Sequence, residues 1–234
     1  MDSRTAYSSG VLSAEADAVD VSERPAQTPA LSLVEAQGAA RASLETFIAR
    51  RFDEVYQARV HRFLPRLFGL HRASGERIAA FGLRAAGEGP LFLEHYLDEP
   101  VERAVFRQFG SPARRGEIAE VGNLAGASPG ALRDLIPELT RFLHREGFRW
   151  LAFTGAARLC NGFSRLGLPL QVVASARLDR LPESERRHWG SYYALEPSVM
   201  LGDIAAGHRI LAAKSGKPGL LDRRLAPVAG VGAP

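Results

Sequence analysis

An acid and an amide lie three residues apart in a stretch that reads as a strand running into a helix. Glu120 and Asn123 belong to residues 116–130. The first part of this stretch has the pattern of a strand, and small residues (glycine, alanine and serine) follow it. In a regular strand the two side chains would point to opposite faces. Gly122 between them is typical of a β-bulge, and one extra residue would return them to the same face. A partly desolvated Glu120 would have a raised pKa, which suits a general base, with Asn123 orienting a substrate or a water.

Each of these roles has an alternative that the residues leave open. A strand glutamate can face solvent or pair with an arginine, and an Asn can cap a bulge. Arg84 either grips a substrate carboxylate through its planar guanidinium or forms an ion pair with Glu94 or Glu120.

The end of the same stretch predicts an anion site. Ser128 is a favourable N-cap and Pro129 suits the first helical position. Backbone N–H groups at such a helix start, around Gly126 to Gly130, can bind a phosphate.

The composition narrows the class of protein. The chain has 234 residues with 46% hydrophobic content, which favours one globular domain with trailing ends. No apolar run approaches the roughly 20 residues that cross a bilayer, and the first thirty residues lack a signal-peptide core. We therefore expect a cytoplasmic protein with no integral membrane association.

Metal and nucleic-acid binding are not predicted. A single cysteine, Cys160, excludes a disulfide framework, and the histidines lack metal-ligand spacing, so we assign no metal. The net charge of +4 and the pI near 9.6 suit an acidic partner but are too weak to predict nucleic-acid binding. The arginines near the central strand are solvated or serve an acidic partner: Arg103, Arg107, Arg114, Arg115, Arg141, Arg145 and Arg149.

Helical spacing alternates with strand-like runs along the chain. Helices are predicted at 38–58, 99–109, 129–146 (kinked at Pro137) and 156–166, and strands at 63–70, 77–84, 149–154 and 170–174. Residues 91–97 read as strand or turn, and 198–214 as a helix. Strand 149–154 should lie parallel to the central strand and splay from it past the bulge.

This order predicts an α/β fold with a mixed central sheet flanked by helices. We expect a single domain over residues 31–185 and a packed C-terminal extension over 186–214. Residues 1–30 and 215–234 are expected to be disordered tails.

The element order resembles the GNAT acyltransferase fold. Within residues 161–168, Asn161, Phe163 and the closing Gly167 are similar to the helix that follows the second core strand of that superfamily. Residues 82–84, 91–94 and 120–125 follow the order seen in acyl-homoserine-lactone synthases, except that Asn123 stands where that family has arginine.

A closer resemblance, over roughly residues 52–202, is to the thermostable hemolysin family. It is carried by the segments 63–65, 82–84, 91–98, 120–125, 153–154 and 189–193. The residues resemble no pore-former, and a surfactant-like acyl product would explain lysis without a lytic protein.

The resemblance implies an N-acyltransferase that moves an acyl group from a thioester to an amine or amino acid. Glu120 would be the base, with Asn123 and Arg84 completing the catalytic set. Acyl-CoA or acyl-phosphopantetheine would be the co-substrate, with no permanently bound cofactor, and an acidic acyl carrier protein is a candidate partner. The expected acceptor site comprises Glu94, Tyr96, Thr154, Trp189 and Tyr193. The expected donor site comprises Leu124, Ala125, Gly126, Ser128, Gly130, Asn161 and Phe163.

Two other functions stay open. The chain could be a membrane-active hemolysin, or a catalytically inactive binding module on this fold. Glu94, Tyr96 and Thr154 could equally be strand-end residues, and the aromatic cluster could be packing.

Overall fold

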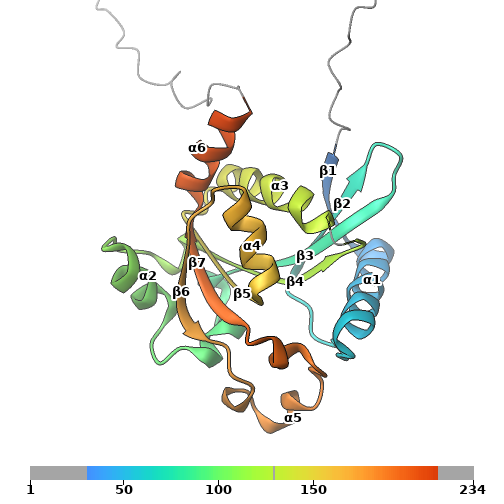
Figure 1. Ribbon diagram of the computed structural model, residues 1–234, viewed down its shortest axis with the longest axis horizontal. Helices are drawn as coiled ribbons and strands as arrows, with labels where there is room; N and C mark the ends of the chain where they lie inside the picture. The colour runs from blue at the N-terminus through green and yellow to red at the C-terminus, as the bar shows by residue number, and fades with distance from the viewer. Residues whose placement is uncertain (1–30, 129, 216–234) are drawn as a thin grey trace, which may run out of the picture. The chain divides into compact units, whose positions relative to one another are not determined.

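A mixed sheet in the order β1-β2-β3-β4-β5-β7-β6 organises the molecule (Figure 1). The computed structural model describes residues 31–128 and 130–215. The strands are β1 (Leu31–Glu35), β2 (Arg66–Arg72), β3 (Arg77–Ala85), β4 (Ile118–Gly126), β5 (Trp150–Gly155), β6 (Leu170–Ser175) and β7 (Ser198–Asp203). Neighbouring strands are antiparallel except for β4 and β5, which are parallel as predicted.

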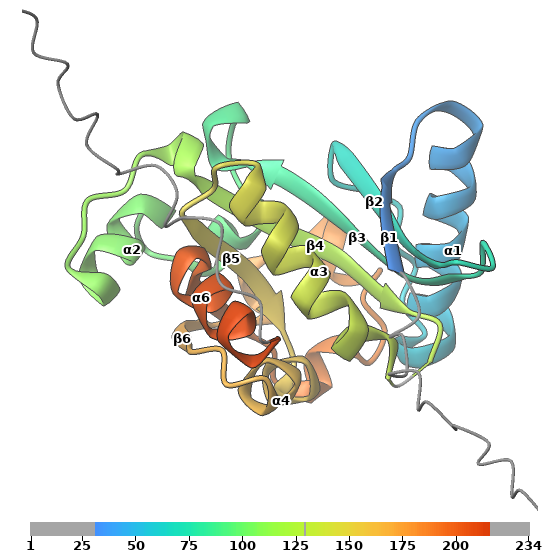
Figure 2. The same ribbon diagram turned by 90° about the horizontal axis from the view of Figure 1, so that it is seen from above.

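Helices cover both faces of this sheet. They are α1 (Gly38–Tyr56), α2 (Val101–Phe109), α3 (Ala131–Arg145), α4 (Ala157–Arg165), α5 (Glu183–Arg186) and α6 (Ile204–Lys214). Short 3₁₀ turns are η1 (Ala86–Glu88), η2 (Phe92–Tyr96), η3 (Arg115–Glu117), η4 (Leu178–Arg180) and η5 (Tyr192–Leu195). Figure 2 shows α3, α4 and α6 together on one face, where they share the largest apolar core. On the other face, one apolar core lies under α1 and a second lies under α2 and η2.

Strand alternation decides which face each residue of β4 uses. Ala119 and Val121 belong to the core under α3, whereas Ile118 packs with α2 and η2. Glu120 therefore points to the face that carries α1, α2 and η2.

The predicted bulge is present in β4. Gly82 pairs with Gly122 but Ala80 pairs with Ala125, so Asn123 and Leu124 together oppose one residue of β3. The left-handed residue of the bulge is Asn123, with φ of 50°, and Gly122 has no positive φ. The extra residue reverses the alternation, and Ala125 accordingly packs under α1.

The strands β4 and β5 splay as predicted, but they part just before the bulge and not past it. Their pairing ends at Val121 and Phe153, after which β4 continues beside β3 to Gly126 and β5 continues beside β7 to Gly155. A gap lined by the residues after Val121 and after Phe153 follows from this register.

Several predicted elements differ from the structure. The strand predicted at 63–70 begins at Arg66, because Pro65 supplies no N–H for the ladder. It is an inner strand, since β1, which was not predicted, pairs along its outer side. Of the two alternatives for residues 91–97, the turn is confirmed as η2 (Phe92–Tyr96), and α2 begins after Pro100.

The C-terminal part is not an extension of the domain. The predicted helix 198–214 is a strand followed by a helix, and β7 lies between β5 and β6 inside the sheet. Ser215, the first residue of the predicted C-terminal tail, is the C-cap of α6. The other residues of the two predicted tails, 1–30 and 216–234, lie outside the described residues.

Candidate active site

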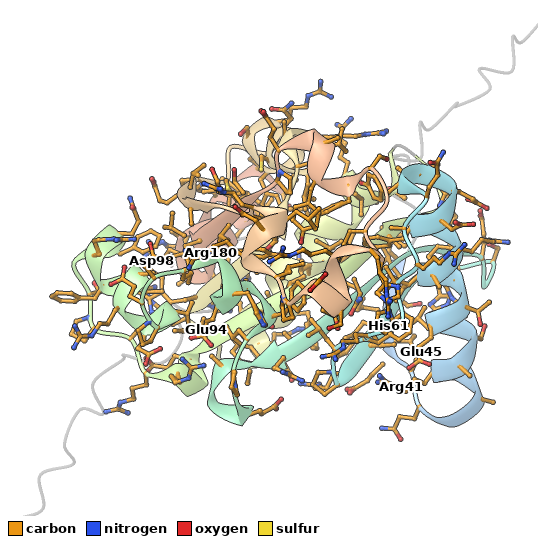
Figure 3. The ribbon with its side chains drawn as sticks, turned by 90° about the horizontal axis from the view of Figure 1, so that it is seen from below. Arg41, Glu45, His61, Glu94, Asp98 and Arg180 are labelled. Carbon is orange, nitrogen blue, oxygen red and sulfur yellow. The ribbon has the colours of Figure 1, made fainter. Side chains whose placement is uncertain are left out.

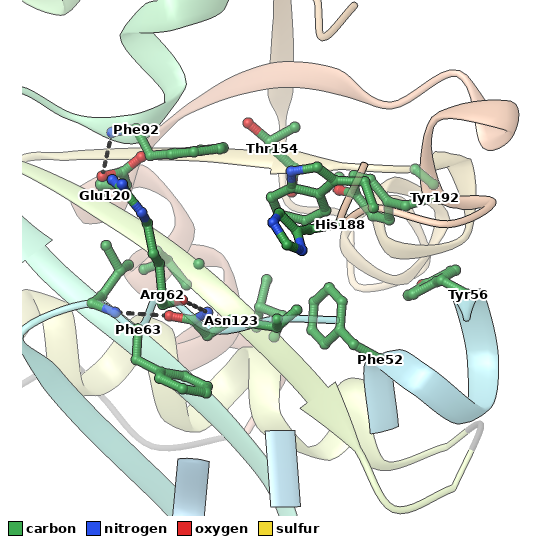
Figure 4. Close-up of a pocket in the computed structure, with 18 of the residues that line it drawn as sticks. Phe52, Tyr56, Arg62, Phe63, Phe92, Glu120, Asn123, Thr154, His188 and Tyr192 are labelled. Carbon is green, nitrogen blue, oxygen red and sulfur yellow. Dashed lines mark hydrogen bonds between the residues drawn. The ribbon is translucent and has the colours of Figure 1, made fainter. Parts of the chain in front are cut away.

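A cavity of about 1210 Å³ opens on the face of the sheet that carries Glu120 (Figure 4). This volume exceeds the roughly 300–1,000 Å³ of common ligand pockets and suits a long or two-part ligand. Its walls come from the end of α1, residues 59–64, η2, residues 120–124 of β4, residues 154–159, and residues 185–195. The gap between β4 and β5 therefore opens into the cavity.

Glu120 lies in the cavity wall with only 4% of its surface exposed. Its carboxylate accepts hydrogen bonds from the backbone N–H of Phe92, at 3.1 Å, and of Leu93, at 2.8 Å. Burial raises the pKa of Glu120 above its ordinary value, and these two N–H groups and the charge of Arg84 oppose that rise. The predicted base is thus both desolvated and held in one orientation.

Arg84 also lines the cavity and lies opposite Glu120 in the β3–β4 register. Its guanidinium donates to the carbonyl oxygen of Pro90 at 2.9 Å. Among the described residues it forms no ion pair, so neither Glu94 nor Glu120 is its partner within salt-bridge distance.

Glu94 does not reach the cavity. Arg115 binds its carboxylate at 2.7 Å, and the N–H groups of Leu91 and Val101 donate to it. Burial alone would raise its pKa, but these bonds lower the pKa of Glu94 to about 2. In Figure 3, Glu94 lies apart from Arg41, Glu45 and His61, which line the cavity. Glu94, predicted for the acceptor site, is therefore outside the cavity wall, and its carboxylate is bound within the protein.

Asn123 holds the segment that crosses from α1 to β2. Its Oδ1 accepts from the N–H of Leu64 at 2.9 Å, and its Nδ2 donates to the carbonyl of Arg62 at 3.2 Å (Figure 4). Both polar groups of the side chain therefore position a wall of the cavity.

Aromatic rings from distant parts of the chain meet in the cavity. Trp189 lies 5.8 Å from Phe92 and 5.4 Å from Tyr192, measured between ring centroids. The hydroxyl groups of Tyr96 and Tyr193 hydrogen-bond each other. Burial raises the pKa of Tyr193 to about 12 and raises that of Tyr96 further, so both phenols are neutral near pH 7.

Two buried polar atoms of the cavity wall lack partners. Thr154 Oγ1 and Trp189 Nε1 have no hydrogen-bond partner within residues 31–128 and 130–215. Unpaired buried polar groups are costly, so each of these atoms calls for a partner such as a water or a polar group of a ligand.

The predicted donor site is largely outside the cavity. Leu124 lines it, but Ala125 is buried under α1, and Gly126, Ser128 and Gly130 are not in its wall. The N-cap of α3 is Gly130 and not Ser128, and the predicted first helical residue, Pro129, lies outside the described residues.

The loop after β4 is engaged within the protein. Arg51 donates to the carbonyl of Gly126 at 2.9 Å, and the N–H of Ala127 donates to Ile78 at 2.8 Å. In α4, Asn161 is exposed and Phe163 stacks on Phe153 in the core under α3. Neither residue lines the cavity, which corrects the prediction.

The sequence reading missed several cavity residues, which are Tyr56, Arg59, Arg62, Arg158, His188 and Tyr192. Arg158 follows directly on β5, so its position after a strand that borders the gap was a usable signal. The others depend on contacts between residues 56–62 and 185–192, which are remote in sequence.

Four of the seven arginines predicted to be solvated or to serve an acidic partner form ion pairs within the protein. Arg107 pairs with Glu99, Arg115 with Glu94 and Glu102, Arg141 with Glu138, and Arg149 with Asp203.

Cys160 packs against the core under α3, and burial raises the pKa of its thiol. The described residues contain no group of three potential metal ligands.

Comparison with known proteins decides the family. Residues 34–208 match the family described as thermostable hemolysin. The chain belongs to the thermostable hemolysin family. Among curated protein sequences, none matches this family member. No helix among its described residues is long and apolar enough to span a membrane.

Solved structures share its fold. FeeM, an N-acyl amino acid synthase from uncultured soil microbes, matches with a TM-score of 0.50 at 14% identity, over 82% of this chain and all of FeeM (100%). The AHL synthase LasI matches at 0.51 and 10%, over 75% of this chain and 90% of LasI. The CoA-dependent acyl-homoserine lactone synthase BjaI matches with a TM-score of 0.51 at 13% identity, over 82% of this chain and 92% of BjaI. This thermostable hemolysin family member therefore shares the fold of these synthases, and it has the predicted α/β architecture of a mixed central sheet flanked by helices.

Proposed function

We propose that the protein is an N-acyltransferase that moves an acyl group from a thioester to an amine or amino acid. The observation that carries the proposal is the buried carboxylate of Glu120 beside the gap between β4 and β5. A general base with a raised pKa suits an ammonium acceptor. The names of the structural neighbours, an N-acyl amino acid synthase and acyl-homoserine-lactone synthases, support the same class of reaction.

The reaction is direct transfer in a complex of both substrates. Glu120 takes a proton from the acceptor ammonium, and the free amine attacks the thioester carbonyl carbon. The C–N bond forms and the C–S bond breaks. The thiolate takes the second proton from the attacking nitrogen and leaves as a thiol, and Glu120 releases the first proton to solvent. Past Val121 the edge of β4 has no strand partner on the β5 side, so its N–H groups are available to a carbonyl or oxyanion.

The acceptor binds beside Arg84. This guanidinium lies opposite Glu120 and pairs with no carboxylate among the described residues. A zwitterionic amino acid places its ammonium at Glu120 and its carboxylate at Arg84. Tyr96, Tyr193, Thr154 and Trp189 form the rest of the acceptor wall in this proposal.

Purified protein incubated with octanoyl-CoA, or octanoyl acyl carrier protein, and a panel of amino acids and amines tests the function. The mass spectrum should show an N-octanoyl product and free thiol in equal amounts. Glu120→Gln should lower kcat by roughly 10²–10⁴, while Glu76→Gln, at an exposed turn, should not change it. Because Gln offers only one oxygen to Phe92 and Leu93, circular dichroism must establish that the variant is folded.

Two results would contradict the proposal. One is wild-type activity in a folded Glu120→Gln variant. The other is lysis of red cells by the purified protein without any acyl donor, which would favour a membrane-active hemolysin.

A further inference from the structure

The cavity carries more positive charge than its own acids neutralise. Five arginines line it, and Arg41 pairs with Glu45 while Arg62 pairs with Glu185. Arg84 lies opposite Glu120. Arg59 and Arg158 are exposed, and their side chains have no hydrogen-bond or ion-pair partner within the described parts of the chain.

These two arginines line the same cavity from two different segments. Arg158 lies in the first turn of α4, three residues after β5 ends, and its charge acts on the hydroxyl of Tyr56. Arg59 follows Tyr56 by three residues, and its N–H donates to the carbonyl of His188 at 2.7 Å. Tyr56 packs edge-on to Tyr192, with ring centroids 5.2 Å apart, and the hydroxyl of Tyr192 donates to the carbonyl of Thr154 at 3.5 Å. The end of α1 and the end of β5 are thus linked through Tyr192.

A ligand that enters the gap from Glu120 passes Thr154 and Gly155 before it reaches Arg158, because these residues continue β5 past its last pair with β4. Of the described residues after β4, Ala127, Ser128 and Gly130 do not line the cavity, and the N–H of Ala127 is already bonded to the carbonyl of Ile78. The phosphate of a donor that lies in the gap would therefore reach the guanidinium group of Arg158, at the start of α4.

We propose that Arg59 and Arg158 bind the phosphate of a phosphopantetheine arm, in place of the loop between β4 and α3. The inference rests on the proposed function and specifies the donor: a thioester whose arm ends in a phosphate, as coenzyme A and carrier-protein prosthetic groups do. Arginine suits this role because its planar fork binds phosphate oxygens through two N–H groups.

Binding of coenzyme A, 4′-phosphopantetheine and pantetheine, measured by calorimetry, tests the site without requiring turnover. Wild type should bind both phosphorylated compounds at least roughly tenfold more tightly than pantetheine. Arg158→Gln and Arg59→Gln should each lose most of this difference and leave pantetheine binding unchanged. Arg165→Gln removes an exposed arginine of α4 that is outside the cavity, and should bind all three as wild type does.

The same data distinguish the two sources of the phosphate. Equal affinity for coenzyme A and 4′-phosphopantetheine assigns the site to the phosphate that both donors share. Tighter binding of coenzyme A, with the gain lost in Arg59→Gln or Arg158→Gln, assigns it to the nucleotide phosphates as well.

Three results would overturn the inference: wild type that does not prefer phosphorylated arms, arginine variants that keep the preference, or variants that weaken pantetheine equally. Octanoyl-N-acetylcysteamine has no phosphate. If it acylates an amine in a Glu120-dependent way, the proposed function survives the loss of this site.

Discussion

Glu120 combines influences that act on its charge in opposite directions. Burial favours the neutral acid, while two backbone N–H groups and Arg84 favour the carboxylate. A carboxylate whose pKa is raised by burial binds a proton more strongly than an ordinary glutamate, which suits the base of an acyltransferase.

The pH dependence of activity should report this balance. The base works deprotonated, so kcat/KM should rise with pH through the pKa of Glu120, which burial places above its ordinary 4.5. Arg84→Gln removes a charge that lowers this pKa, so the rising limb should move to higher pH. Arg72→Gln, on the exposed hairpin, is the control. A limb that stays in place in Arg84→Gln would contradict this account of the site.

Asn123 should matter for both the bulge and the crossing segment. Asn123→Gly keeps a residue that tolerates positive φ but loses the bonds to Leu64 and Arg62, which should cost about 1–3 kcal/mol of unfolding free energy. Asn123→Ala loses the bonds and also strains the left-handed conformation, for roughly 1 kcal/mol more. Urea denaturation of both variants measures the difference, and equal stabilities would show that φ is not constrained here.

At this scale the sequence predicted the burial of Glu120 and the bulge better than it predicted the contacts of individual side chains. Gly122 indicated the bulge, and the buried acid was recognisable from its apolar neighbours. The partners of Glu94 and Arg84 were not predictable, because Arg115 and Pro90 reach them through the turn η2 and its long-range packing.

Two segments remote in sequence close one side of the cavity. The N–H of Ser191 donates to the carbonyl of Tyr56 at 2.8 Å, and Arg62 pairs with the buried Glu185 at 3.0 Å. Gly190, between them, has φ of 48° and lies so close that a Cβ would meet the carbonyl oxygen of Tyr56 at 2.1 Å. The contact between residues 56–62 and 185–191 needs a glycine here.

Gly190→Ala should therefore separate these segments. The clash and the positive φ together should lower the unfolding free energy by at least about 2 kcal/mol and weaken donor binding. Gly75→Ala has φ of 84° but open space around its Cβ, so it should cost only about 1 kcal/mol. Urea titration compares the two, and equal losses would mean that the close approach is unimportant.

The ion pair between Arg115 and Glu94 fixes the start of η2, whose N–H groups hold Glu120. Arg115→Gln should cost on the order of 2 kcal/mol near pH 7, allowing for partial solvent screening. The folded-state pKa of Glu94 is depressed to about 2 from 4.5, so its stabilisation is present above pH 4.5 and is lost as the pH falls toward 2. The difference from wild type should shrink over that range.

Arg107→Gln, which removes an exposed arginine paired with Glu99, should change stability by less than about 0.5 kcal/mol. Thermal unfolding from pH 7 to pH 2 measures both variants. A difference between Arg115→Gln and wild type that is independent of pH would contradict the assigned pKa of Glu94.

Elements with a strong local pattern were predicted, and those set by tertiary packing were not. The 3.6-residue period located α1 and α3. The strand β7 was read as helix because its residues run directly into α6, and only pairing with both β5 and β6 makes them a strand.

Across the whole molecule, the site depends on how the sheet is assembled. The parallel pair β4 and β5 separates because β4 bulges and continues with β3, while β5 continues with β7. Segments from the end of α1 and from residues 185–195 then cover the gap. The sequence indicated the splayed strands, but the covering segments follow from contacts across more than a hundred residues.

The most direct measurement is a crystal structure with an octanoyl-CoA analogue in which a thioether replaces the thioester. The account predicts that its sulfur lies beside Glu120, in the gap beyond Val121 and Phe153, with the acyl chain or the arm in the 1210 Å³ cavity. An analogue bound elsewhere, with β4 and β5 closed against each other past Phe153, would contradict it.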